Sequence, residues 1–247
     1  MAEFRDGKLK IDSKRSAFEA LLDISIVAML TVLFAFNKQV EGENYIYYIT
    51  FFAVIGLSFL VSILGRATVS VKLPTIWYGV FIVLCALSSV WALYDPNLSL
   101  RYISRMVQVL FICFCITLYI KTREDFERFT MLFTAAVMIM IFSVFVRTPY
   151  ALWFSGFFGR INNENVTGNN INTLAYICVV AVAISFCKAY YYKKRAYYLC
   201  TAFELLYIVL SSSRKALFIV AFLLFAMLIF YAVSYTHLRA HETRSNL

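Results

Sequence analysis

The chain contains 247 residues, of which 62% are hydrophobic and only 15% are charged. Its mean hydropathy of +0.76 lies well outside the range of soluble domains. This composition excludes a soluble enzyme or a soluble binding module. It predicts an all-α, polytopic integral membrane helix bundle, because a helix satisfies its own backbone hydrogen bonds within the bilayer.

Eight apolar runs follow in chain order, at residues 20–36, 46–64, 75–94, 103–120, 129–146, 172–187, 197–211 and 216–232. Each is close to the length of about 20 residues with which a helix crosses a bilayer, although the sixth and seventh must borrow flanking residues. The first run has no small-residue cleavage site after it, so we expect it to be retained as a helix. Short loops favour antiparallel packing of about eight transmembrane helices.

The charges between the runs predict which side of the membrane each loop faces. With a cytoplasmic N-terminus, the inner segments carry fourteen Lys and Arg residues and the outer segments carry seven. Those seven are Lys38, Arg101, Arg105, Arg147, Arg160, Arg214 and Lys215. Basic residues accumulate on the cytoplasmic side, so this bias predicts that the N-terminus lies inside.

The last fifteen residues, 233–247, are predicted not to be native. Their first part, VSYTHLRAHET, matches the translation of a transposon-derived sequencing adapter in one reading frame. We therefore expect residues 1–232 to form a transmembrane domain that is the N-terminal part of a longer protein. Both histidines, His237 and His241, fall in the tail, so the native part offers no imidazole base and few ligands for a transition metal.

The six cysteines lie within apolar runs and are interpreted as small packing residues. Cys113 and Cys115 are two positions apart, which places them about 200° apart around a helix. They are therefore not expected to share a metal ion or to form a disulfide with each other.

The polar stretch GRINNENVTGNN, at residues 159–170, belongs to the longest predicted outer segment. Two helices that run from outside to inside begin after polar motifs, TGNNINTLAY and LSSSRKALF. We expect Asn170, Asn172 or Thr173 to cap the first of them, and Ser212 or Ser213 to cap the second. The positive ends of both helix dipoles would then face the same side of the membrane.

Arg214 and Lys215 are poorly placed for stability alone, because a cation at a helix N-terminus is opposed by the macrodipole by about 0.3 to 1 kcal/mol. A bound anion would reverse that effect, and a guanidinium at a helix start suits phosphate oxygens. The alternative is that the outer arginines pair only with lipid phosphates or with Glu164. We predict an outward-facing diphosphate site made of Arg160 and Arg214 with Arg101 or Arg105, in which Asn169, Asn170 and Asn172 shape the loop or bind sugar hydroxyls.

Three motifs, in this order, resemble the O-antigen ligase and O-antigen polymerase superfamily of bacterial surface-polysaccharide assembly. They are SSVWALYDPNLSLRYISRMVQVL between the third and fourth runs, an Arg followed by GNNINTLAY, and LSSSRKALFIVAFLL at the eighth run. The resemblance covers residues 76–232. The family loop reads Asn-Pro-Asn, and this chain departs from it by placing Ile171 at the Pro position.

The resemblance implies glycosyl transfer at the outer face of the bacterial cytoplasmic membrane, by a polysaccharide polymerase or an O-antigen ligase. The donor would be a glycan linked to a polyprenyl diphosphate such as undecaprenyl diphosphate. Membrane lipids and other polysaccharide-assembly proteins would be further partners, and nucleic acid would not. The bond is already activated, so no cofactor is expected, in agreement with the lack of a Gly-rich Lys/Ser phosphate loop. The resemblance assigns no catalytic residue within the chain, because family members carry further catalytic residues in a long external loop that would follow Ala232.

Two other classes of function remain open. A transporter or flippase of lipid-linked oligosaccharide also needs polar groups in the bilayer, and Asp23 and Glu204 are intramembrane carboxylates. Asp23 is near a helix end and is expected to lie at the interface, whereas Glu204 is expected to face the bundle with Ser, Thr or Arg as its partner. The third class is a non-enzymatic membrane scaffold, which accounts for the spans but not for the outer arginines.

Overall fold

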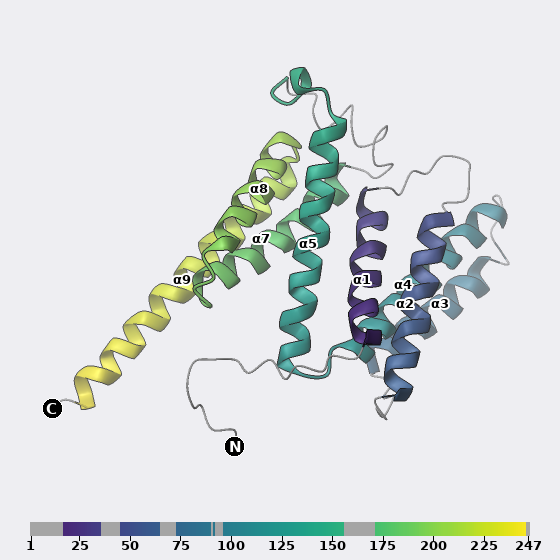
Figure 1. The fold of residues 1–247 in the computed structure, drawn as a ribbon, viewed down its shortest axis with the longest axis horizontal. Helices are drawn as coiled ribbons and strands as arrows, with labels where there is room; N and C mark the ends of the chain where they lie inside the picture. Colours follow the sequence, from purple (N-terminus) through teal and green to yellow (C-terminus); the bar gives the residue numbers. More distant parts are fainter. Residues whose placement is uncertain are drawn as a thin grey trace. The chain divides into compact units, whose positions relative to one another are not determined.

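The computed structural model describes residues 17–35, 45–64, 73–89, 91, 96–155 and 171–245, with the backbone alone for 64, 96–101, 171 and 230–245. Within these ranges the chain forms helices joined by turns, and no strand (Figure 1). The helices are α1 (Ala17–Ala35), α2 (Tyr45–Leu64), α3 (Leu73–Ser89), α4 (Pro96–Tyr119), α5 (Arg123–Arg147), the single-turn η1 (Tyr150–Leu152), α7 (Ile171–Tyr190), α8 (Ala196–Leu210) and α9 (Arg214–Ser245). Each predicted apolar run falls on one α-helix, so the all-α fold class is confirmed.

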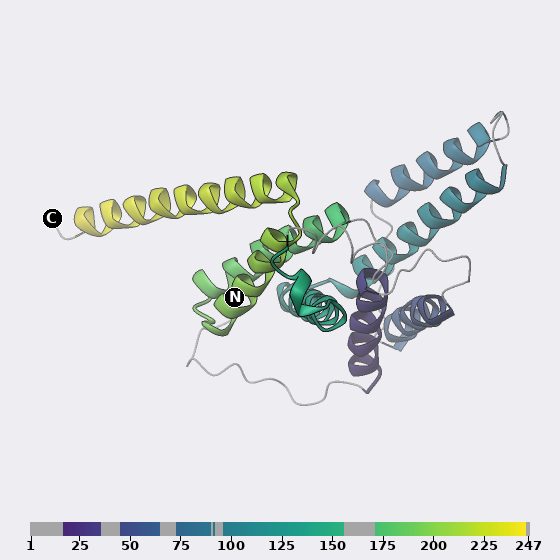
Figure 2. The same ribbon diagram turned by 90° about the horizontal axis from the view of Figure 1, so that it is seen from above.

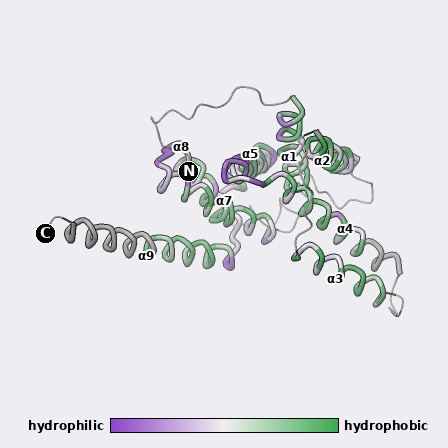
Figure 3. Tube along the Cα trace, turned by 90° about the horizontal axis from the view of Figure 1, so that it is seen from below, coloured by the Kyte–Doolittle hydropathy of each residue, from purple (hydrophilic) through white to green (hydrophobic). Residues whose placement is uncertain are grey.

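Among the described residues, five helices are long and apolar enough to cross a membrane, namely α1, α2, α4, α5 and α7. The helices α3 and α8 are also apolar but shorter. Hydrophobic residues follow one another along α1, α2 and α7, and hydrophilic residues mark the start of α5 (Figure 3). The chain is therefore a multi-pass helical membrane protein. The predicted count of eight spans and the cytoplasmic N-terminus stay predictions.

The predicted boundary between the third and fourth helices was wrong by several residues. We expected an apolar run to residue 94, but α3 ends at Ser89, and the Trp91 N–H then donates to the Ser88 carbonyl at 3.2 Å in a turn. The next helix, α4, begins at Pro96 and not near residue 103. Hydropathy overlooks the polar first turns of α4, whereas a proline at the first helical position has a suitable φ and needs no donor.

The last helix also extends past its predicted end. We expected the eighth run to stop at residue 232, but α9 continues through Ser245 and so includes most of the tail that we set aside. Neither Pro nor Gly occurs at 233–245, so nothing in the tail interrupts a helix. That the tail is not native stays a prediction.

The chain divides into two compact units, the first made of residues 1–26 and 50–125 and the second of residues 27–49 and 126–247. In the first unit α3 and α4 pack side by side (Figure 2). The Tyr119 hydroxyl at the end of α4 donates to Asp23 Oδ1 on α1 at 2.6 Å. Only 11% of the apolar window of α4 is buried, which suits a helix whose sides face lipid.

The second unit is built around α7, which packs against α8 and α9 (Figure 1). Half of the apolar window of α7 is buried, at 50%. The buried side chains lie three or four positions apart along one stripe, which is the spacing of a helix face: Leu174, Cys178, Ala181, Ser185 and Lys188. Three of them are small, and small residues let neighbouring membrane helices approach closely.

Three helix ends meet at the end of α7 that is predicted to be cytoplasmic. The Lys188 ammonium donates to the Glu127 carbonyl near the start of α5 at 2.9 Å. It also lies 5.3 Å from the centroid of the Tyr197 ring at the start of α8. Because the end of α7 therefore lies beside the starts of α5 and α8, α7 runs antiparallel to α8, as the short loops predict.

Candidate functional site

The candidate site begins at the tight link between α8 and α9. Three serines, at 211–213, connect Leu210 to Arg214. Ser212 adopts a left-handed backbone with φ 55°, and its N–H donates to the Val209 carbonyl at 3.1 Å. The Ser213 carbonyl accepts the N–H of Leu217 at 3.0 Å, which is the first hydrogen bond of α9. Ser213 thus occupies the N-cap position, one of the two candidates that the sequence offered.

A single side-chain hydrogen bond joins the start of α9 to the start of α7. The Ser213 hydroxyl, which is only 3% exposed, donates to Asn172 Oδ1 at 2.9 Å. These residues are 41 positions apart in the chain. The positive ends of two helix dipoles therefore lie beside each other, which favours a negative charge nearby.

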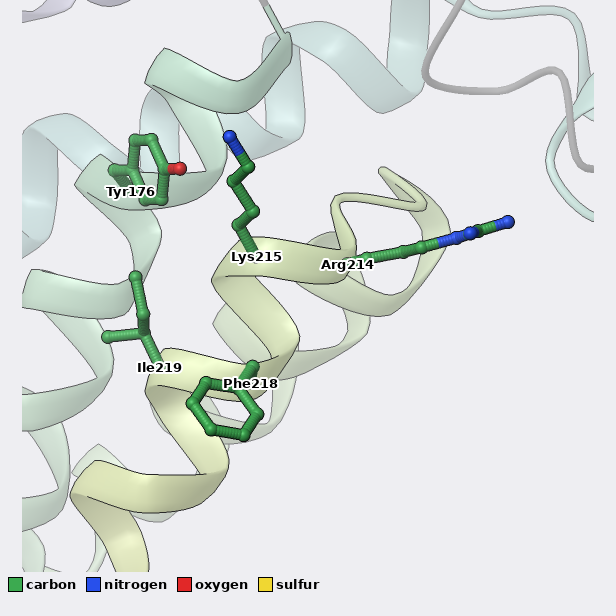
Figure 4. A pocket seen from close by; sticks show the side chains of 5 residues that line it. All are labelled: Tyr176, Arg214, Lys215, Phe218 and Ile219. Atoms are coloured by element: carbon green, nitrogen blue, oxygen red, sulfur yellow. The ribbon is translucent and has the colours of Figure 1, made fainter.

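A pocket of about 400 Å³ opens beside this junction (Figure 4). It is lined by Tyr176 of α7 and by Arg214, Lys215, Phe218 and Ile219 of α9. In Figure 4 the Lys215 side chain extends toward Tyr176, whereas the Arg214 side chain extends away from both. Phe218 and Ile219 lie about one turn further along α9 and give the pocket an apolar side.

This arrangement suits an amphiphilic anion. An ammonium, a guanidinium and a phenol hydroxyl are hydrogen-bond donors that phosphate oxygens accept. The two helix starts add partial positive charge. The chemistry that these groups offer is binding and stabilisation of negative charge.

The predicted site residues fall into three groups: those at the pocket and junction, those on α4 and those outside the described residues. Arg214 lines the pocket, and Asn172 holds the junction through Ser213 without lining the pocket. Arg105 is an exposed residue of α4 in the first unit, and Arg101 belongs to the same helix, with its side chain outside the described part. Arg160, Asn169 and Asn170 lie outside the described residues. A joint site for all these residues therefore stays a prediction.

The predicted caps of α7 need a correction. Helix α7 begins at Ile171, so Asn172 and Thr173 are its second and third residues and neither precedes it. An N-cap must precede the first helical residue, so neither can take that role. The Asn172 side chain turns instead to the neighbouring helix start, which gives it a bridging role that the sequence did not suggest.

Four residues of the pocket were not predicted as site residues: the polar Tyr176 and Lys215, and the apolar Phe218 and Ile219. Tyr176 follows Asn172 by four positions, which places both on one face of α7. Lys215 was considered only as a cation that the helix dipole disfavours. It precedes Ile219 by four positions, so both residues lie on the same side of α9. A helical projection of TGNNINTLAY and LSSSRKALF could have found Tyr176 and Lys215.

The two membrane carboxylates occupy different surroundings. Asp23 is 6% exposed and accepts the Tyr119 hydrogen bond, and its expected place at the membrane interface stays a prediction. Seven residues into α1, it turns inward because a donor is available there. Glu204 is fully buried at 0% exposure and accepts a hydrogen bond from the Ser185 hydroxyl at 3.0 Å. Glu204 was predicted to face the bundle with Ser, Thr or Arg as its partner, and the structure confirms its burial and gives Ser185 as the partner.

The cysteines are all free thiols. Cys113 is exposed and Cys115 is buried, as their angular separation on a helix predicts. No group of three or more His, Cys, Asp or Glu residues that could hold a metal ion occurs within the described part of the chain.

Comparison of the chain with family models, with curated proteins and with solved structures gives no match.

Proposed function

We propose that the chain takes part in glycosyl transfer from a polyprenyl-diphosphate-linked glycan at the outer face of the bacterial cytoplasmic membrane. In this proposal it is a polysaccharide polymerase or an O-antigen ligase. The observation that carries the proposal is the 2.9 Å bond between Ser213 and Asn172. It joins two of the three motifs on which the family resemblance rests, those that contain GNNINTLAY and LSSSRKALF, beside a pocket with two cations.

The pocket supports a role in stabilising the leaving group. In the proposed reaction an acceptor hydroxyl attacks the anomeric carbon, and the bond from that carbon to the diphosphate oxygen breaks. Negative charge then grows on the departing diphosphate, where Arg214 and Lys215 would stabilise it. The apolar side, Phe218 and Ile219, would lie against the first isoprene units of the carrier. The hydroxyl proton passes to a base to which the proposal assigns no residue.

The first test measures binding, because binding does not require the acceptor side. Farnesyl diphosphate is titrated into the chain in lipid nanodiscs and followed by calorimetry. We expect Arg214→Ala and Lys215→Ala each to weaken binding about tenfold or more, since a hydrogen bond to a charged group contributes about 1.5 to 3 kcal/mol. Arg147→Ala, which removes another basic residue predicted on the same side, is the matched control and should change binding less than about twofold. Equal affinity in all four proteins would refute the site.

The second test measures transfer. The chain is reconstituted with a polyprenyl-diphosphate-linked glycan, and release of the polyprenyl diphosphate is followed. We expect Arg214→Ala to abolish release while the helical content is retained. The two buried carboxylates favour a second function, a flippase of lipid-linked oligosaccharide. Movement of the lipid-linked glycan across vesicles without its consumption would support the flippase and exclude the transferase.

A further inference from the structure

Glu204 is a buried carboxyl group that the pocket does not use. It lies on α8 facing α7, with 0% of its surface exposed. Its Oε1 accepts the Ser185 hydrogen bond at 3.0 Å. Its Oε2 is buried and has no hydrogen-bond partner among the described residues. Half of the carboxyl group is therefore desolvated without compensation.

Among the described residues, the groups that face Glu204 from its neighbouring helices do not supply a positive charge. From α7 these are the Ser185 hydroxyl and the Cys178 thiol, and on α8 itself the Cys200 thiol lies one turn away. Lys188 lies on the same stripe of α7, but its ammonium is bonded to the Glu127 carbonyl and faces the Tyr197 ring. The described cations of α9, which also packs on α8, are Arg214 and Lys215 in its first turn, beside the pocket.

An ionised carboxylate in these surroundings would lack the solvent, the cation and the additional donors that stabilise a buried charge. A neutral carboxylic acid avoids most of that cost, because only one polar bond is then missing at Oε2. A buried acid in an apolar helix is also the arrangement by which membrane proteins hold a transferable proton.

We infer that the interface between α7 and α8 contains a proton-binding site, in which Glu204 is held as a neutral carboxylic acid by Ser185 and an apolar enclosure. The ligand of this site is a single proton on the carboxyl group. The proton leaves when a cation or a water chain reaches the carboxyl group, because only such a partner replaces the missing stabilisation. The site is independent of diphosphate binding at the α7–α9 junction, so either proposal can fail without the other.

The test is infrared difference spectroscopy on the full chain in nanodiscs at neutral pH. We expect a carboxylic-acid C=O stretching band that shifts in D2O, disappears in Glu204→Gln and persists in Asp23→Asn. Asp23→Asn is the matched control because it makes the same chemical change at the other buried carboxyl group. A band that persists undiminished in Glu204→Gln, or that disappears in Asp23→Asn, would overturn the inference.

A second variant tests the inference even if Glu204→Gln fails to fold. Ser185→Ala keeps the carboxyl group and removes its donor, so we expect the band to remain and to move to higher frequency. The shift is expected because a carbonyl that loses a hydrogen bond becomes stiffer. An unchanged band position in Ser185→Ala would show that the acid is not Glu204 and would equally overturn the inference.

Discussion

Two buried carboxyl groups, one in each unit, differ in the hydrogen bonds that they accept. Asp23 of the first unit is bonded by the Tyr119 phenol at 2.6 Å, a length typical of a hydroxyl that donates to an ionised carboxylate. Glu204 of the second unit has a serine donor at 3.0 Å and a second oxygen without a partner in the described residues. Burial is similar at 6% and 0%, so burial alone does not distinguish them. The donors do, because Asp23 accepts a short bond from a phenol and Glu204 accepts a longer one from a serine.

The largest effect is expected from removing the donor of Asp23. Tyr119→Phe leaves a buried charge without its short hydrogen bond, which should lower the free energy of unfolding by about 3 kcal/mol. Chemical denaturation in detergent micelles measures it. Tyr102→Phe makes the same change on the same helix at a residue that is 58% exposed, and should cost less than about 0.5 kcal/mol. Equal costs at the two tyrosines would show that the bond to Asp23 does not stabilise the fold.

The same substitution at both carboxyl groups tests the comparison directly. Asp23→Asn removes a charge-assisted hydrogen bond and should lower the free energy of unfolding by about 2 kcal/mol. Glu204→Gln replaces a neutral acid by a neutral amide of the same shape and should change it by less than about 0.5 kcal/mol, because the amide oxygen keeps the Ser185 bond. Thermal unfolding followed by circular dichroism gives both values. A larger loss at Glu204 than at Asp23 would reverse the assignment.

Ser185→Ala has a smaller expected effect, because it removes a bond between two neutral groups. The loss should be about 1 kcal/mol, as for an ordinary buried hydrogen bond. Denaturant titration of Ser185→Ala in the wild-type and Glu204→Gln backgrounds forms a double-mutant cycle that isolates the pair. A cost above about 3 kcal/mol would indicate that Ser185 stabilises an ionised carboxylate.

Hydropathy predicted the helices because membrane spanning depends on the length and composition of a run and not on its partners. It failed where polar residues are helical, as in the first turns of α4, which contain Arg101. It also gave no partner for Asp23, since no pattern in the sequence shows that Tyr119, 96 positions away, reaches it.

The candidate site was also predictable only in part from the sequence. Alternation of the spans was sufficient to place the starts of the sixth and eighth runs on one side. The bond between Ser213 and Asn172 was not predictable, because it depends on how far α9 rotates after the serine link. The same rotation turns Lys215 toward Tyr176 and Arg214 away, which adjacent positions in a sequence cannot reveal.

The smallest expected effect lies in the serine link, where the backbone and not a buried charge is under strain. Ser212 has φ 55°, a left-handed conformation that costs a residue with a Cβ about 1 kcal/mol. Ser212→Gly should therefore raise the free energy of unfolding by about 0.5 kcal/mol after the greater freedom of glycine in the unfolded chain is subtracted. Its neighbour Ser211 is right-handed at φ −64°, so Ser211→Gly is the matched control and should destabilise by about 1 kcal/mol. If the denaturation midpoints of both variants shift in the same direction, the serine link carries no left-handed strain. The orientation of Lys215 at the pocket would then be set by the contacts of α9 alone.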